Sequence, residues 1–273
     1  MFTFVIPAYN EEATVATIVE QACAAAQAGD RVVVVDSAST DGTAREAAKA
    51  GAEVLHGPRG KGAAMNAALA EVRAEWVCFL DADLVSSKND VPAMLRDAAA
   101  SGTADHVVGD YEYDYPGTIL SSTFTIYEPL TAALFPEVGF LGANSLTGYR
   151  AIRTSRIRKP LPPHFGVEAF LNISTALDGG TASVCHLGII ESRFRYNGGS
   201  MAHEIGGTIL DMAVAHGRLK PEDRPAWNRW LDDGVRAIAP HKADSGRSAT
   251  LARLFTAARR PMPLSQPRRA QSA

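Results

Sequence analysis

The residues of this sequence best suited to chemistry are the two acids of Asp81-Ala82-Asp83, which follow an apolar run ending at Leu80. Side chains two positions apart in an extended segment point the same way, so both carboxylates can face one ion. Mg2+ and Mn2+ prefer such hard oxygen ligands and take substrate phosphate as a further ligand. A solvated loop is the alternative for the triplet alone. Its place after a buried strand instead favours a divalent metal that neutralises a diphosphate leaving group.

A cation and further acids accompany this triplet. Lys61 lies in the segment Gly57–Gly62, which we expect to be a flexible loop, and its ammonium could contact a diphosphate. An exposed surface lysine is the alternative. Asp41 is also placed to cap a helix, and Glu11 could serve only to favour the positive end of a helix dipole. Whether these residues form a functional site, or have only surface and helix-capping roles, depends on the elements that carry them.

Those elements alternate between strand-like and helix-like patterns. Apolar or β-branched runs predict four strands, over Phe2–Pro7, Arg31–Asp36, Glu53–Leu55 and Trp76–Leu80. Helical patterns follow the first three, over residues 12–26, 41–50 and 63–72. Such repeated units predict a parallel sheet with right-handed crossovers, whose ligands bind beyond the C-terminal strand ends. Polar residues gather at those ends, in the segments 8–12, 36–41, 56–61 and 81–83.

The pattern beyond residue 105 is less regular. A strand is expected over His106–Gly109, followed by an aromatic, acidic segment to Pro116. Helices are expected over residues 118–135, 167–177, 200–236 and 248–258. From about Arg259 the abundance of Pro, Arg, Ser and Gln predicts disorder. The sequence therefore predicts an α/β protein with a mostly parallel sheet flanked by helices.

The composition is that of an ordinary globular protein. The 273 residues are 46% hydrophobic and 21% charged, enough for one substantial core or two small ones. A net charge of −3 provides no field to recruit nucleic acid or an anionic membrane. No apolar stretch approaches the roughly 20 residues of a membrane helix, and no signal-peptide pattern opens the chain. We therefore expect a cytoplasmic protein, with Cys23, Cys78 and Cys185 as buried, reduced thiols.

Two common nucleotide-binding motifs are missing from the sequence. A dinucleotide site needs Gly-x-Gly-x-x-Gly directly after the first strand, so that backbone can approach the pyrophosphate. The sequence there is Pro7-Ala-Tyr-Asn-Glu11, without glycine. A P-loop ending at Gly60-Lys61 would need glycine in place of Leu55 and serine or threonine in place of Gly62. Both classes of site are excluded.

Four segments within the first 85 residues resemble the motifs of the GT-A glycosyltransferases in order and spacing. They are Val5-Ile-Pro-Ala-Tyr-Asn-Glu-Glu12, Val35-Asp-Ser-Ala-Ser-Thr-Asp-Gly-Thr43, Gly60-Lys-Gly-Ala63 and Leu80-Asp-Ala-Asp-Leu84. Within that superfamily the chain resembles the retaining glucosyl-3-phosphoglycerate synthase family, over residues 2–210. The later shared elements are Pro129-Leu130, Pro136-Glu137, Leu146-Thr-Gly148, Tyr149-Arg-Ala151, Phe165-Gly-Val-Glu168 and Leu187-Gly188.

The resemblance implies a GT-A fold and assigns roles to individual residues. Lys61 would meet the diphosphate, Asp81 and Asp83 the metal, and Glu168 the donor-sugar hydroxyls or the acceptor. Thr123 and Gly148 would contact the acceptor. The nucleotide-sugar site would comprise Pro7, Ala8, Tyr9, Glu11, Ser37, Lys61, Asp81, Leu146 and Glu168. We expect a donor-binding half over 1–110, an acceptor-side half of the same domain over 111–240, and a C-terminal helix and disordered tail over 241–273.

Two departures from that family concern the metal and the acceptor. The family has a histidine metal ligand shortly after Leu-Gly, but Ile189-Ile-Glu-Ser-Arg193 contains none, and Glu191 or His203 could substitute. The family also binds its acceptor's phosphate with an arginine in a Gly-Arg-x-Thr loop, where this chain has Ser121 and Thr123. A phosphate would then lose its strongest bidentate partner. We therefore expect a neutral or carboxylate acceptor rather than 3-phosphoglycerate.

The expected reaction transfers a hexose, glucose by resemblance, from a UDP- or GDP-hexose to a hydroxyl of a small-molecule acceptor, with retention. The candidate catalytic residues are Asp83, Lys61 and Glu168, and the cofactor is Mg2+ or Mn2+. Three alternatives stay open. They are an inverting polyprenyl-phosphate sugar synthase, a nucleotide-sugar-binding protein without activity, and a nucleotidyltransferase, although the last lacks its glycine-rich loop. A homodimer is compatible with the sequence.

Overall fold

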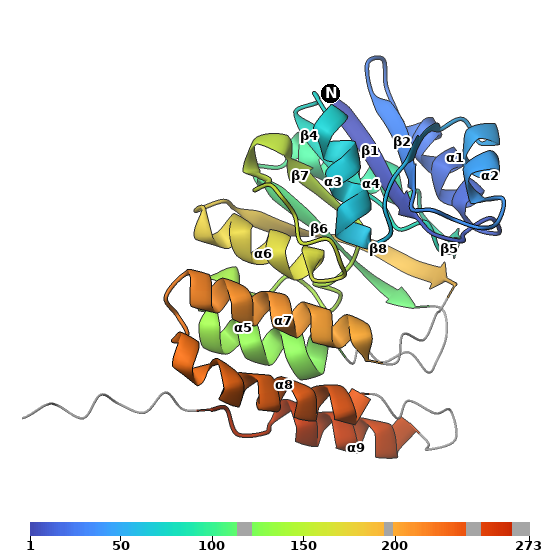
Figure 1. Ribbon diagram of the computed structural model, residues 1–273. Helices are drawn as coiled ribbons and strands as arrows, with labels where there is room; N and C mark the ends of the chain where they lie inside the picture. Colours follow the sequence, from blue (N-terminus) through green and yellow to red (C-terminus); the bar gives the residue numbers. More distant parts are fainter. Residues whose placement is uncertain (114–121, 194–198, 239–246, 264–273) are drawn as a thin grey trace, which may run out of the picture.

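One mixed sheet organises the residues that the computed structural model describes, 1–113, 122–193, 199–238 and 247–263 (Figure 1). Within these residues eight strands lie in the order β3-β2-β1-β4-β7-β6-β8-β5. They are β1 (Phe2–Ala8), β2 (Arg31–Asp36), β3 (Glu53–His56), β4 (Trp76–Phe79), β5 (Leu84–Ser87), β6 (His106–Tyr113), β7 (Arg150–Arg153) and β8 (Ala182–Ser192). The first four strands are mutually parallel, as the sequence predicts.

The remaining strands make the sheet mixed. Strand β7 lies between β4 and β6 and is antiparallel to both. Strand β8 is parallel to β6, and β5 is antiparallel to β8. Because β7 returns beside β4, the segment that precedes β7 arrives at the edge of the sheet where β4 ends.

Helices cover both faces of this sheet. Those of the described residues are α1 (Val15–Ala25), α2 (Thr43–Lys49), α3 (Lys61–Glu71), α4 (Val91–Ser101), α5 (Glu128–Leu134), α6 (Val167–Leu177), α7 (Ser200–Ala215), α8 (Arg224–Ile238) and α9 (Arg247–Ala258). Short turns of helix are η1 (Thr123–Tyr127), which is π-helical, η2 (Pro136–Val138), η3 (Thr154–Arg156) and η4 (Pro221–Asp223). Within the described segments, each helix is too short or too polar to cross a bilayer.

The alternation of buried side chains along the strands separates the core into layers. In β1, Phe4 and Ile6 pack with α1 and α4 on one face, whereas Val5 packs with α3 and α6 on the other. Side chains that alternate in this way are what strands covered on both faces require. The second side of α6, through Ala169 and Ile173, joins a further apolar cluster with α5, α7, α8 and α9. Figure 1 shows these helices stacked beyond α6, away from the parallel strands.

The structure corrects several boundaries. Lys61 is the first residue of α3 and does not lie in a loop, because Gly60 (φ 116°) turns the chain and the Ala63 amide donates to the Pro163 carbonyl at 2.9 Å. Strand β6 continues to Tyr113 and so includes part of the acidic, aromatic segment. The expected helix over 118–135 is η1 followed by α5 from residue 123 onward. Its first residues, and most of the tail expected to be disordered, lie outside the described residues.

The close approach of α3 to the 162–163 segment predicts opposite effects at two helical glycines. A Cβ on Gly62 would lie 1.7 Å from the Pro162 carbonyl oxygen, whereas one on Gly207 in α7 would meet nothing within 4 Å. Gly62→Ala should therefore lower the free energy of unfolding by about 1–3 kcal/mol. Gly207→Ala should raise it by about 0.5–1 kcal/mol. Urea denaturation measures both, and equal effects would contradict the packing described.

Candidate functional site

The polar segments after β1, β2, β3 and β4 meet at one edge of the sheet. The register pairs Ala8 with Asp36 and Asp36 with His56, so these strands end side by side. The Ser37 amide donates to the Ala8 carbonyl at 2.8 Å, and the Gly57 amide donates to the Asp36 carbonyl at 2.9 Å. These bonds continue the sheet pairing into the loops and fix the loops above the strand ends.

A group of partly and fully buried charges lies at this edge. The Lys61 ammonium is 2.7 Å from Oδ1 of Asp81 and 2.6 Å from Oε1 of Glu168. The Gly148 amide donates to Oδ2 of Asp81 at 3.1 Å. Glu168, in the first turn of α6, is only 3% exposed. The structure thus brings together four residues singled out in the sequence, from four separate segments of the chain.

The charge of Lys61 is stabilised by its two acids. Burial by itself would lower the pKa of Lys61, but the charges of Asp81 and Glu168, and hydrogen bonds to both, raise it above its ordinary value. A lysine at the first position of a helix also faces the positive end of the helix dipole. The two carboxylates offset both costs, so Lys61 stays protonated at neutral pH.

Asp83, two residues after Asp81, lies in an environment of like charge. Burial, the largest cause, and the nearby carboxylates of Asp81 and Glu11 together raise the pKa of Asp83 to about 7, although Lys61 opposes the rise. Among the described residues no cationic side chain forms an ion pair with Asp83. Oxygen donors lacking a counter-charge fit Mg2+ or Mn2+, which need only one or two protein carboxylates when phosphates and water complete the shell.

The two expected substitutes for a third metal ligand lie elsewhere. Glu191, on β8, accepts a hydrogen bond from the Ser86 hydroxyl at 2.9 Å. His203, on α7, lies 3.2 Å from Asp232. Nowhere in the described part of the chain do three His, Cys, Asp or Glu side chains form a group that could hold a metal. Neither residue therefore replaces the family histidine in this arrangement.

The residues assigned to the nucleoside line the outer part of the same edge. Pro7 and Ala8 end β1, and Ser37 is buried directly after β2. The guanidinium of Arg59 stacks over the Tyr9 ring, 4.1 Å from its centre. Glu11 accepts a hydrogen bond from the Thr14 hydroxyl at 2.8 Å, and its charge acts on Asp83. A flat aromatic surface and a fixed acid thus flank the charged centre.

Arg193, which the sequence did not single out, joins two of these loops. Its guanidinium is 2.9 Å from Oε2 of Glu11 and also donates to the Asn10 carbonyl, while its amide donates to the Asp83 carbonyl at 2.8 Å. It directly follows β8, far along the chain from both loops. An arginine after a strand carries no local signal of such a contact, so only the pairing of β8 with β5 reveals it.

The other assigned residues are Leu146, of the nucleotide-sugar site, and Thr123 and Gly148, of the acceptor site. Leu146 is half-buried and packs against the apolar cluster of the later helices. Thr123 opens η1 and is 5% exposed. Gly148 contacts Asp81, as described above. Ser121, at the position of the family's phosphate-binding arginine, lies outside the described residues.

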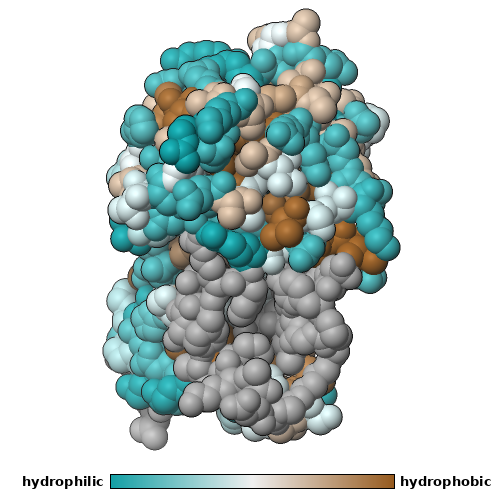
Figure 2. Space-filling view, turned by 90° about the vertical axis from the view of Figure 1, so that its right-hand side faces the viewer, coloured by the Kyte–Doolittle hydropathy of each residue, from teal (hydrophilic) through white to brown (hydrophobic). Residues whose placement is uncertain are grey.

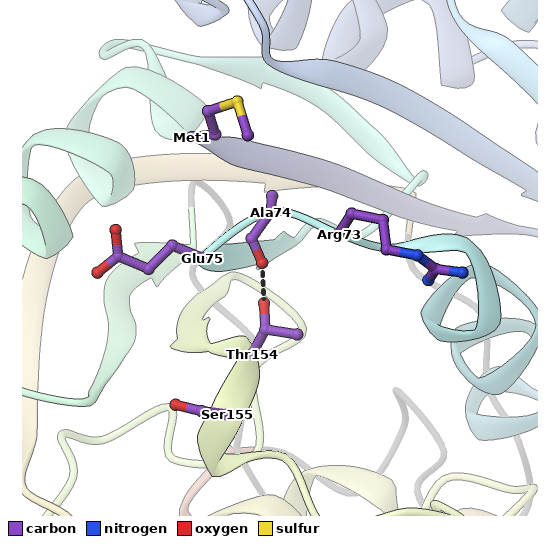
Figure 3. Close-up of a pocket in the computed structure, with 6 residues that line it drawn as sticks. All are labelled: Met1, Arg73, Ala74, Glu75, Thr154 and Ser155. Atoms are coloured by element: carbon purple, nitrogen blue, oxygen red, sulfur yellow. Dashed lines mark hydrogen bonds between the residues drawn. The ribbon is translucent and has the colours of Figure 1, made fainter.

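A depression in the described part of the chain lies at the opposite edge of the sheet. It is lined by Met1, Arg73, Ala74, Glu75, Thr154 and Ser155 (Figure 3). It contains the hydrogen bond from the Thr154 hydroxyl to the Ala74 carbonyl, at 2.7 Å. Met1 precedes β1 and Glu75 precedes β4, so the depression lies at the amino ends of the strands, away from Asp81. In the view of Figure 2, apolar surface forms small, separate patches among hydrophilic residues.

Solved structures with the same arrangement define the class of protein. Glucosyl-3-phosphoglycerate synthase from Mycobacterium tuberculosis, solved with Mn2+, UDP-glucose and phosphoglyceric acid, matches with a TM-score of 0.70 at 28% identity, over 78% of this chain and 79% of that one. Mannosyl-3-phosphoglycerate synthase from Rubrobacter xylanophilus matches with a TM-score of 0.71 at 25% identity, over 81% and 76%. The fold is the GT-A glycosyltransferase fold.

Sequence comparison then gives the family. Residues 3–157 match the model of glycosyl transferase family 2, and the chain belongs to this family. The glucosyl-3-phosphoglycerate synthase of Mycolicibacterium paratuberculosis is 28% identical over 232 residues, which cover 76% of this chain and 70% of the relative. The protein is therefore a hexosyltransferase, as the sequence motifs predicted.

The shared lysine predicts a large loss of stability when it is removed. In Lys61→Met, Glu168 would remain buried without its cation, so the free energy of unfolding should fall by about 3 kcal/mol or more. The control is Lys49→Met, because Lys49 pairs with Glu46 on the surface with 64% of its side chain exposed. That change should stay within about 0.5 kcal/mol. Equal losses in urea denaturation would contradict the buried ion pair.

Proposed function

We propose that this protein transfers glucose from UDP-glucose to a hydroxyl of a small acceptor, with Mg2+ or Mn2+ as cofactor. The observation that carries the proposal is the group of Lys61, Asp81 and Glu168 beside Asp83 at the carboxyl edge of the parallel strands. Ligands of open α/β sheets bind at such an edge. The solved relative with Mn2+ and UDP-glucose supports the choice of donor and metal.

Different side chains would have different roles at the leaving diphosphate. Asp83, with Asp81, would hold the divalent ion, which neutralises charge on the diphosphate when bound. Lys61 would supply a fixed positive charge on the other side of Asp81. Because Lys61 is held by two carboxylates before the donor binds, it needs little reorganisation as charge develops, which is the basis of electrostatic catalysis.

The donor's other parts have their own candidate contacts. Tyr9, with Arg59 stacked over it, offers a flat surface to the base, and Pro7, Ala8, Glu11 and Ser37 complete the nucleoside site. Glu168 would accept hydrogen bonds from sugar hydroxyls next to Lys61. Leu146 would line the same sugar pocket, whereas Gly148 and Thr123 would face the acceptor. The division of the chain into donor and acceptor halves, and a cytoplasmic location, remain predictions.

The acceptor is the least defined partner. The glucosyl-3-phosphoglycerate synthase of Mycobacterium tuberculosis was solved with phosphoglyceric acid and, separately, with glycerol 3-phosphate. This chain has no arginine at the position of the family's phosphate contact, where Ser121 stands. We therefore propose a neutral or carboxylate acceptor. A non-catalytic nucleotide-sugar-binding protein is the second candidate, because the described residues provide no third metal ligand.

Replacement of Asp83 tests the proposed function. Asp83→Asn should abolish Mn2+-dependent consumption of UDP-glucose, because the amide is neutral and binds divalent ions weakly, while the fold stays intact. The matched control is Glu191→Gln, whose acid contacts Ser86 and should leave turnover unchanged. Release of UDP is measured with glycerate and with 3-phosphoglycerate as acceptors. Binding of UDP-glucose without turnover by the unaltered protein would favour the non-catalytic candidate.

The stereochemistry of transfer gives a separate prediction. The family likeness implies retention, by attack on the same face as the departing phosphate. Proton NMR of the product, started from α-configured UDP-glucose, should show the α-anomer. A β-configured product would instead place the chain among inverting enzymes of the same fold.

A further inference from the structure

A buried arginine lies beneath the charged centre. Arg150, the first residue of β7, is 1% exposed. A buried charge of this kind is rare unless its donors are fully used. Among the described residues no acid lies within ion-pair distance of its guanidinium. Its direct hydrogen-bond acceptors are neutral oxygens, while the carboxylates of Glu168 and Asp81 stabilise its charge from farther away.

The guanidinium is directed at the turn that precedes β7. Nε donates to the Thr147 carbonyl at 3.0 Å, and Nη2 donates to the same oxygen and to the Ser145 carbonyl at 3.3 Å. Nη1 donates to Oδ1 of Asn172, on α6, at 2.9 Å. A guanidinium carries several donors in one rigid plane and can therefore bond to these converging oxygens together. A lysine ammonium or an apolar side chain could not make the same set of hydrogen bonds.

A second layer holds the arginine in place. The Asn172 amide group donates to the Ser145 carbonyl at 2.8 Å and to the Tyr127 hydroxyl at 2.9 Å. Nε2 of His106 lies 3.4 Å from Nη1 of Arg150. Asn172, Tyr127 and His106 are all buried. The guanidinium thus has one position, fixed from β6, α6 and η1.

The turn that Arg150 holds also carries the contact to Asp81. Gly148, one residue beyond Thr147, donates its amide to Oδ2 of Asp81 at 3.1 Å. The fit is tight, because a Cβ on Gly148 would lie 2.0 Å from Oδ1 of Asp81. Oδ1 in turn is the oxygen that pairs with Lys61. A shift of the turn would therefore move Asp81 and its ion pair.

We propose that Arg150 is a positioning residue for the donor site: by holding the Ser145 and Thr147 carbonyls, it fixes the Gly148 amide against Asp81. The orientation of Asp81 and Lys61 toward the diphosphate then depends on a side chain that does not touch the donor. This inference rests on the proposed function, since it concerns the same site. Residues that hold a ligand-binding side chain in place from behind are known to tune ligand and metal affinity, and Arg150 would act in this way through the turn before β7.

The test compares two buried arginines. Arg96, on α4, is 9% exposed, donates to the Ala25 carbonyl and pairs with Asp30 at 3.4 Å, remote from the turn. Arg150→Met and Arg96→Met should both lose stability. In the presence of Mn2+, Arg150→Met should weaken UDP binding, measured by calorimetry on folded protein, by roughly tenfold or more. Arg96→Met should bind UDP like the unaltered protein, and Arg150→Lys should restore part of the affinity.

Kinetics separate positioning from general damage. Arg150→Met should raise the KM for the donor while the KM for the acceptor stays unchanged. If Arg150→Met does not fold, Asn172→Ala removes an acceptor of Arg150 and a donor to Ser145, and should weaken UDP binding several-fold by the same route. Unchanged UDP affinity in the folded variants, or equal weakening in Arg96→Met, would overturn the positioning role. Failure of the unaltered protein to bind UDP would instead overturn the proposed function.

Discussion

The ion pairs of Lys61 with Asp81 and Glu168 are the interaction on which the site depends. They join the start of α3, the end of β4 and the first turn of α6, which are distant along the chain. Each partner is costly to bury alone, because a charge removed from water needs a compensating charge nearby. Together the three residues fix the geometry of the edge before any ligand binds.

The position of β7 makes this geometry possible. The parallel strands alone would bring Ala8, Asp36 and Asp81 to one edge. The antiparallel β7, inserted beside β4, delivers the turn with Gly148 and the buried Arg150 to the same place. The site is thus built where the parallel and antiparallel parts of the sheet meet.

The charges on either side of Asp81 differ in their surroundings. Lys61 pairs with Asp81 and Glu168, whereas Asp83 is under the like charges of Asp81 and Glu11. Arg193 pairs with Glu11 but leaves the carboxylate of Asp83 available. A hexosyltransferase of family 2 needs positive charge at a departing diphosphate, and a divalent cation beside Asp83 would supply it under the function proposed above.

The sequence by itself determined the elements and the local chemistry. Apolar and β-branched runs predicted the parallel strands, and the position of Asp81 and Asp83 after the fourth run predicted an acidic edge. Only the tertiary structure decided which distant residues meet them. Glu168 was placed through family likeness, while the roles of Arg193 and Arg150 had no sequence signal. Local patterns record burial and turns, but a contact between distant segments depends on strand order, which short-range periodicity does not encode.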